Sequence, residues 1–125
     1  MKVEREVSFS AEEVRDWCDQ AGDSNGIHLS EQEAADSVFG ERVVPGMMIL
    51  DQVSGLVEQY GSIEGEYAIL ANVVACRFRD PIPLDEEVTI SVEESDSDNS
   101  FTYLDFEART WDGLAVHGTV GVVIK

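Results

Sequence analysis

The spacing of apolar residues divides the chain into a helical first half and a strand-rich second half. Met1–Ser8 alternates valine with charged residues, which predicts a short strand. Ser10 and Glu13 form a capping-box pattern, and apolar residues at helical spacing follow as far as Gly22, so a helix is expected between these points. A second capping-box pattern predicts a further short helix that ends near Ser37.

The longest stretch with helical spacing follows a predicted loop over residues 39–46. Apolar positions recur from Met47 to Tyr60 and cover most of the helix surface, which predicts a helix of roughly 14 residues that is buried on most sides. We expect this helix to lie at the centre of the fold.

The pattern changes to strands after this helix. Alternating or β-branched segments span residues 67–79, 86–94, 101–111 and 115–124. Prolines end the first of them, and Asp112-Gly113 is typical of a tight hairpin turn between the last two. A buried helix followed by an antiparallel meander predicts an α+β fold in which the sheet wraps the helix, within a single domain of residues 1–125.

The charge of the chain narrows the range of partners. The sequence has 26 acidic and 8 basic residues, a net charge of −18 at pH 7, so nucleic acid and anionic membranes would be repelled. Only Lys2 and Lys125 among the basic residues are lysines. A dispersed acidic surface with few lysines suits concentrated salt, where screening removes self-repulsion. We interpret the chain as a halophile protein, the alternative being an ordinary acidic cytosolic protein.

The two cysteines, Cys18 and Cys76, are too few for a disulfide framework or a four-ligand zinc site. Neither has a histidine or a second cysteine at ligand spacing, so we expect buried apolar thiols. The sequence shows no apolar leader and no apolar run of about 18 residues. We therefore expect a soluble, cytoplasmic protein.

Candidate chemistry lies in the loop from Gly22 to His28. Asp23 and His28 are separated by Asn25 and Gly26, among others, in a turn-rich segment. Such a loop can bring a carboxylate and an imidazole to one water molecule. The imidazole would take a proton from water and the carboxylic acid would give one to carbon, as hydration of a double bond requires. The alternative is a surface turn in which the polar side chains cap their own backbone.

The segment from Trp17 to Ala34, with Phe39–Met47 after it, resembles the MaoC-like dehydratase family, also known as the (R)-specific enoyl-CoA hydratases. The family signature is an aromatic residue, a run of small residue-Gly-Asp-x-Asn-Pro-aliphatic-His, and an alanine beyond the histidine. The chain supplies, in register, Trp17, Ala21, Gly22, Asp23, Asn25, Ile27, His28 and Ala34. The resemblance implies a hot-dog fold, an antiparallel β-sheet wrapped around a central α-helix.

The resemblance also implies roles for individual residues. Asp23 and His28 match the catalytic acid–base pair, and Asn25 matches the residue that orients this loop. The family's oxyanion donor is a backbone N–H at the start of the central helix, which falls on Gly46 or Met47. A helix N-terminus suits that role, because its N–H groups lack partners and its dipole favours a developing enolate.

The match of Ser54, on the central helix, indicates a supporting role less specifically than the matches above. Ser54 matches a helix serine that supports the active site in family members. The alternative is that Ser54 is a small residue that allows close packing beside Gly55.

The function implied by the resemblance is reversible hydration of a trans-2-enoyl-CoA to the (R)-3-hydroxyacyl thioester. Acyl carrier protein is a possible second carrier, and no metal or redox cofactor is implied. Family members typically form homodimers in which two units share one continuous sheet. Fatty-acid breakdown and supply of polyhydroxyalkanoate monomers are the settings implied. Two alternatives remain open: a hot-dog acyl-CoA thioesterase, and a non-catalytic module that binds acyl thioesters.

Three positions depart from the family pattern. Gly26 replaces the signature proline, which loosens the loop, and Ala21 replaces the usual serine or threonine. Pro45 stands where the family has the histidine of a His-Gly-Met run. That histidine does not transfer the proton, so activity is expected to survive while the positioning of the acyl chain or pantetheine differs.

The run Val44–Met47 with Asp51 also resembles the acyl-carrier-protein dehydratases, which share the hot-dog fold. Those enzymes place a catalytic histidine before the acidic residue of the central helix, at the position that is Ser37 here. This interpretation therefore lacks its base.

The remaining polar candidates are weaker. His117 lies within the last predicted strand and is expected to be structural. Arg77 and Arg79 end the long strand and would suit a phosphate of coenzyme A, since guanidinium pairs well with phosphate. The favoured expectation is that both pair with nearby carboxylates on the surface.

Overall fold

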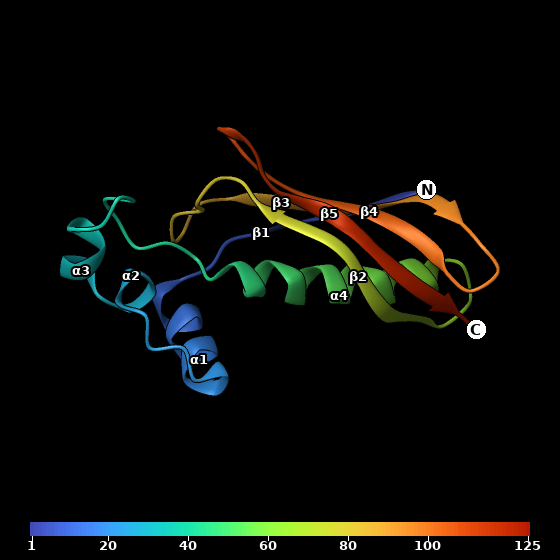
Figure 1. Cartoon of the computed structure of the whole chain (residues 1–125), viewed down its shortest axis with the longest axis horizontal. Coiled ribbons are helices and arrows are strands. Elements are labelled where there is room, and N and C mark those ends of the chain that lie inside the picture. The colour runs from blue at the N-terminus through green and yellow to red at the C-terminus, as the bar shows by residue number, and fades with distance from the viewer.

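The computed structural model describes residues 1–125 and forms a five-stranded antiparallel sheet with four helices (Figure 1). The elements are β1 (Lys2–Val7), α1 (Ala11–Ala21), α2 (Gly26–Leu29), α3 (Glu31–Ala35), α4 (Gly46–Ile63), β2 (Ala68–Phe78), β3 (Val88–Ser97), β4 (Thr102–Thr110) and β5 (Gly113–Ile124). The strand order is β1-β3-β4-β5-β2. Helix α4 runs lengthwise along one face of the sheet, whereas α1, α2 and α3 lie together beyond one end of it. This is the α+β hot-dog arrangement, as predicted.

The start of α1 confirms the capping box. The Ser10 N–H donates to Glu13 Oε1 at 3.2 Å, and the Glu13 N–H donates to Ser10 Oγ at 3.1 Å. Phe9 and Val14 are both buried in the core, as a hydrophobic staple across the cap requires. Local sequence therefore determines both where this helix begins and how the chain enters it.

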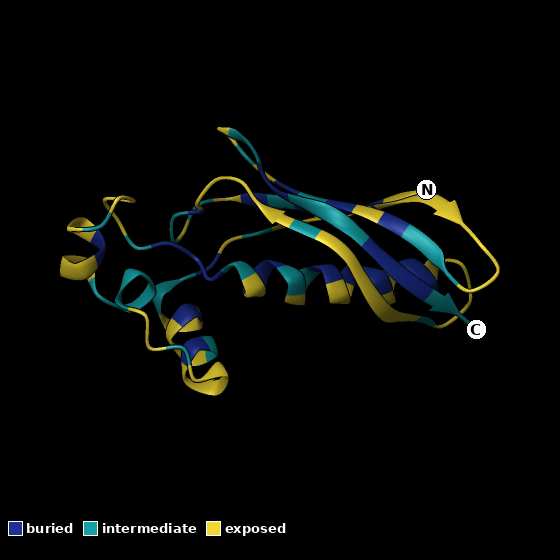
Figure 2. Cartoon of the chain, viewed as in Figure 1, coloured by how far each residue is buried: buried dark blue, intermediate teal, exposed yellow.

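Helix α4 supplies the centre of the core. Its apolar residues Met48, Ile49, Val53, Leu56 and Val57 are buried, and they belong to one cluster of 22 buried residues that joins α4, the sheet and α1 (Figure 2). The expectation that this helix is buried on most sides is wrong for the single chain. Its opposite face is exposed, because no element of the chain packs against that side.

The strands agree with the predicted segments to within a few residues, but β2 has an unexpected environment. It forms one edge of the sheet and pairs only with β5. Its apolar side chains are largely exposed, among them Ile69, Val73, Val74 and Phe78. An apolar edge strand with one free side is typical of an interface with another chain.

None of the four helices combines the length and the hydrophobicity that a membrane span requires.

A half-buried hydrogen bond gives α4 a pH-dependent link to the sheet. The hydroxyl of Tyr60 donates to Glu94 Oε2 at 2.6 Å. Burial, with the acceptor carboxylate of Glu94, raises the pKa of Tyr60 to about 12. A raised folded-state pKa contributes stability that is complete below the unfolded value, near pH 10, and is lost as the pH rises through the folded value.

We therefore expect the free energy of unfolding to fall between about pH 10 and about pH 12, by about 2–3 kcal/mol from this group. The variant Tyr60→Phe should lack this component. Urea unfolding of both proteins at several alkaline pH values measures the difference between them. An equally steep loss of stability in the variant would contradict the assignment.

The acidic surface leads to a second stability prediction. Few carboxylates have a basic partner: the ion pairs are Arg42–Glu31, Arg109–Glu107 and His28–Asp23. Because the other carboxylates repel one another, screening by molar KCl should raise Tm by about 5 °C or more, given that each kcal/mol shifts the Tm of such a domain by about 4 °C. Calorimetry at low and molar KCl checks this. A flat or falling Tm would remove the halophile interpretation.

Candidate active site

The candidate site begins where α1 ends. Gly22 adopts a left-handed conformation with φ of 74°, which residues with a side chain rarely do, and its N–H donates to the carbonyl of Cys18. The N–H of Asp23 donates to the same carbonyl at 2.9 Å. The chain therefore turns sharply off α1 and presents Asp23 immediately after the helix.

Two successive side-chain caps carry the chain from Asp23 to the candidate base. Asp23 Oδ1 accepts from the N–H of Asn25 at 2.9 Å, and Asn25 Oδ1 accepts from the N–H of Ile27 at 3.2 Å. Asn25 is thereby the N-cap of the one-turn helix α2, which carries His28. The sequence predicts a loop here, and the structure contains a helical turn because Asn25 caps it.

The histidine is held through one ring nitrogen and faces the carboxylate with the other. His28 Nδ1 lies 2.7 Å from the carbonyl oxygen of Val43. A carbonyl can only accept, so Nδ1 carries the hydrogen and the neutral ring has its lone pair on Nε2. His28 Nε2 lies 3.8 Å from Asp23 Oδ2. The His28 side chain is 11% exposed and that of Asp23 is 33% exposed, so the pair meets at the edge of a buried region.

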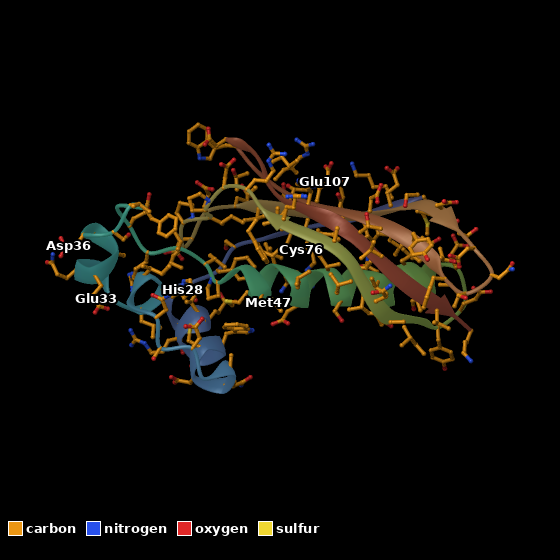
Figure 3. The ribbon with its side chains drawn as sticks, viewed as in Figure 1. His28, Glu33, Asp36, Met47, Cys76 and Glu107 are labelled. Atoms are coloured by element: carbon orange, nitrogen blue, oxygen red, sulfur yellow. The ribbon has the colours of Figure 1, made fainter.

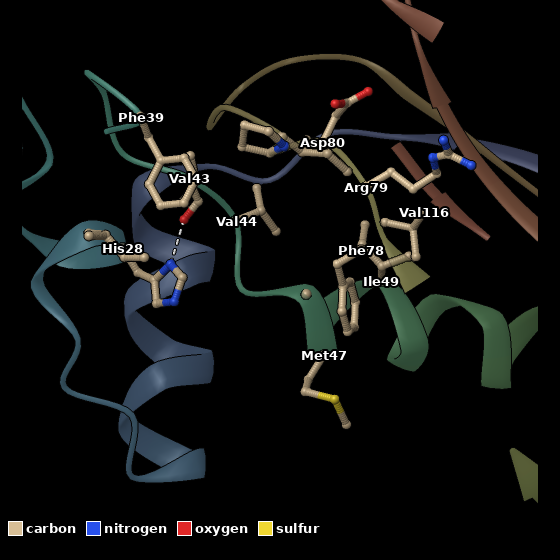
Figure 4. A pocket seen from close by; sticks show the side chains of 14 residues that line it. His28, Phe39, Val43, Val44, Met47, Ile49, Phe78, Arg79, Asp80 and Val116 are labelled. Atoms are coloured by element: carbon tan, nitrogen blue, oxygen red, sulfur yellow. Dashed lines mark hydrogen bonds between the residues drawn. The ribbon is translucent and has the colours of Figure 1, made fainter. Parts of the chain in front are cut away.

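A pocket of about 340 Å³ opens beside this pair (Figure 4). His28 lies on its wall, together with residues from the loop before α4, the first turn of α4 and the end of β2. The wall is mostly apolar: Ile27, Phe39, Val43, Val44, Gly46, Met47, Ile49, Phe78, Pro81, Ile82 and Val116, with His28, Arg79 and Asp80 as its charged or titratable members. An apolar chain with a polar head would fit such a lining.

The start of α4 places backbone donors without a protein acceptor among the residues that line this pocket. Pro45 is the N-cap and provides no side-chain hydrogen bond, and the N–H groups of Gly46 and Met47 have no acceptor in the protein. A β-carbon on Gly46 would lie 2.5 Å from the ring of Phe78. Any side chain at this position would therefore have to displace the Phe78 ring, which is half exposed.

The structure brings some predicted site residues together and separates others. His28, Gly46 and Met47 all line the pocket, whereas Asp23 and Asn25 do not, and Asp23 lies 3.8 Å from the His28 ring. Figure 3 shows Met47 at the start of α4, beside the group of helices in which α2 carries His28. Ser54 does not line the pocket and is exposed on α4.

The structure shows the surroundings of two residues that depart from the family signature, Gly26 and Pro45. Gly26 lies directly under the carboxylate of Glu33, which occupies the place of a β-carbon at this position. A proline or alanine here would require the exposed Glu33 side chain to move aside. Pro45 leads into α4 with an extended backbone, φ −57° and ψ 130°, and contributes no polar group to the pocket.

The two cysteines and the second histidine of the chain lie outside the pocket. Cys18 is buried, and burial raises the pKa of its thiol, with the Asp23 charge adding to the effect. Burial also raises the pKa of the half-buried Cys76. His117 lies on β5, opposite Glu107 and Arg77, and away from the pocket. No three His, Cys, Asp or Glu side chains are grouped so as to hold a metal ion.

The alternative acidic residue of the central helix is engaged elsewhere. Asp51 Oδ2 accepts a hydrogen bond from Trp17 Nε1 at 2.7 Å, which links α4 to α1. Asp51 does not line the pocket.

At the end of β2, the sequence indicates Arg79 only as a weaker candidate for binding a coenzyme A phosphate and does not identify Phe78. Phe78 and Arg79 line the pocket from the end of that strand, far along the chain from the loop that carries His28. Both arginines near the strand end, Arg77 and Arg79, lack an ion-pair partner, so the expectation that they pair with carboxylates is wrong. Only the contact between the strand end and α4 could have placed these residues.

Comparison with known proteins gives a consistent result. The sequence model of the MaoC-like domain family matches residues 1–111. The 3-hydroxyacyl-thioester dehydratase Z of Mycobacterium tuberculosis is 31% identical over 83 residues, covering 66% of this chain and 55% of that protein. The chain thus spans about half the length of this curated relative.

Solved structures extend the similarity over nearly the whole chain. An (R)-hydratase from A. caviae involved in PHA biosynthesis is 29% identical, with a TM-score of 0.88 over 98% of this chain and 92% of that one. The fluoroacetyl-CoA thioesterase FlK is 12% identical, with a TM-score of 0.70 over 100% of this chain and 85% of that one, and shares the fold alone.

Proposed function

The chain belongs to the MaoC-like domain family, and on this basis we propose that it catalyses reversible hydration of a trans-2-enoyl thioester to the (R)-3-hydroxyacyl thioester, with coenzyme A as the carrier. The observation that carries the proposal is the pair of His28 Nε2 and Asp23 Oδ2, 3.8 Å apart beside an apolar pocket. Water held between these two atoms would lie at the polar end of the acyl chain.

The proposed hydration balances two proton transfers. The lone pair on His28 Nε2 takes a proton from water while the water oxygen forms a bond to C3 of the enoyl group. The C2–C3 double bond opens, and C2 takes a proton from the Asp23 carboxylic acid. Proton transfer from the histidinium to the Asp23 carboxylate then restores both groups, and the 3.8 Å separation leaves them close enough for one bridging water. No metal or redox cofactor takes part in this scheme.

Backbone groups at Val43 and at the start of α4 support the scheme, together with the side chain of Asn25. The Val43 carbonyl holds hydrogen on Nδ1, so Nε2 is left free to accept the proton from water. The N–H of Gly46 or Met47 would donate to the thioester oxygen, where negative charge develops as water adds to C3. Asn25 is proposed to hold the loop, since its side chain caps α2.

The test is a hydration assay on crotonyl-CoA with a simultaneous measurement of free thiol. Loss of the enoyl absorbance without thiol release supports hydration. Thiol release would instead favour the thioesterase alternative, for which the shared fold with FlK is the only support. Binding of crotonyl-CoA with neither reaction would make the protein a non-catalytic acyl-thioester-binding module.

We further propose that the chain forms a homodimer through β2. The strand has a free edge, and its exposed apolar residues include Ile69, Val73 and Val74. Pairing of two such edges would extend the sheet across both copies and cover these side chains. Light scattering measures the mass in solution. The variant Val74→Lys should be monomeric, and a monomeric parent protein would overturn the proposal.

The A. caviae (R)-hydratase is involved in PHA biosynthesis. We propose supply of polyhydroxyalkanoate monomers or fatty-acid breakdown as the setting.

On the exposed face of α4, we propose that Ser54 supports the site within the dimer.

A further inference from the structure

The pocket contains one permanent positive charge. Arg79 is the only lysine or arginine among its lining residues. The guanidinium has no carboxylate within ion-pair distance and makes no hydrogen bond, although its backbone N–H is fixed to the carbonyl of Ala115 at 2.7 Å. The neighbouring Asp80, labelled beside Arg79 in Figure 4, forms no ion pair with it. The charge of Arg79 is therefore available to a ligand.

Arg79 is the one arginine without an ion pair that lies at the pocket. Acidic residues outnumber basic ones by 26 to 8, and the arginines that do pair, Arg42 and Arg109, bind glutamates. The net charge of −18 repels any anionic substrate at long range. A guanidinium at the pocket counteracts this repulsion locally, and its planar fork of N–H donors matches the oxygens of a phosphate.

We propose that Arg79 binds a phosphate of the group that carries the acyl thioester. This inference rests on the proposed function, because it assumes that the pocket receives a phosphopantetheine thioester. The phosphate has two sources: the nucleotide end of coenzyme A, or the phosphopantetheine phosphate that coenzyme A shares with acyl carrier protein. Arg79 would act in substrate binding and take no part in proton transfer.

The chain offers a matched control for this charge. Arg77 precedes Arg79 by two residues at the end of β2, is also exposed and unpaired, and does not line the pocket. It pairs across the strands with His117. Replacing either arginine by glutamine changes the net charge equally, so a difference between the two variants reports the local contact rather than long-range attraction.

The experiment measures the Kd of thioesters that cannot be hydrated. We expect Arg79→Gln to weaken binding of butyryl-CoA about tenfold, as loss of a charged hydrogen bond does, and to leave butyryl-pantetheine, which has no phosphate, unchanged. Arg77→Gln should change either Kd by less than about twofold. Butyryl-phosphopantetheine identifies the source: an equal tenfold loss assigns the shared phosphate, and no loss assigns the nucleotide end.

Three results would overturn the inference: no effect of Arg79→Gln on butyryl-CoA, an equal effect of Arg77→Gln, or an equal effect of Arg79→Gln on butyryl-pantetheine. Turnover of crotonyl-CoA by the parent protein separates the two proposals. Hydration with no Arg79 effect contradicts this inference alone, whereas absence of any butyryl-CoA binding by the parent protein contradicts both.

Discussion

Replacing His28 with glutamine, or Asp23 with asparagine, is expected to lower the kcat for crotonyl-CoA hydration by at least about a hundredfold, the usual effect of removing a positioned acid or base. Neither replacement should unfold the protein. Asparagine retains an oxygen that can accept from the Asn25 N–H, and glutamine at 28 loses only the hydrogen bond to the Val43 carbonyl. The two variants therefore test the chemistry of the pair rather than the integrity of the loop.

The second histidine of the chain provides the control. His117 lies on β5 away from the pocket, so His117→Gln should leave kcat unchanged. Stopped assays on all three variants, with melting curves to verify the fold, complete the comparison. Near-normal turnover in either His28→Gln or Asp23→Asn would contradict the proposed mechanism.

The sequence predicts the parts of the fold that depend on neighbours along the chain. Ser10 and Glu13 define the start of α1, and Gly22 ends it, because capping and a left-handed turn involve only adjacent residues. The close approach of Asp23 and His28 is local for the same reason, since consecutive caps connect them.

Features that depend on distant contacts were not predictable from the pattern. The strand pattern of β2 does not show that this strand lies at an edge, because periodicity identifies a strand without its neighbours. The contact of Phe78 with Gly46, and the place of Arg79 in the pocket, arise only when the end of β2 meets the start of α4. The exposed face of α4 was misjudged because its apolar residues do not reveal what covers them.

The role of the backbone at the start of α4 is tested by a pair of variants at Gly46. Gly46→Ala and Gly46→Pro both introduce a β-carbon, which must displace the Phe78 ring that lies 2.5 Å away from that position. Only proline also removes the N–H. Proline suits the first position of a helix, and Pro45 before it has the extended backbone, with ψ of 130°, that a following proline requires.

If the Gly46 N–H donates to the thioester oxygen in the transition state, kcat on crotonyl-CoA should be about a hundredfold lower for Gly46→Pro than for Gly46→Ala, the loss that follows from removing one oxyanion donor, about 3 kcal/mol. The Kd of butyryl-CoA should be similar in the two variants, because the donor acts mainly on charge that develops during the reaction. Equal kcat values would exclude Gly46 as the donor and leave the N–H of Met47. A difference confined to Kd would show instead that this turn of α4 shapes the acyl pocket, and the oxyanion role would then be wrong.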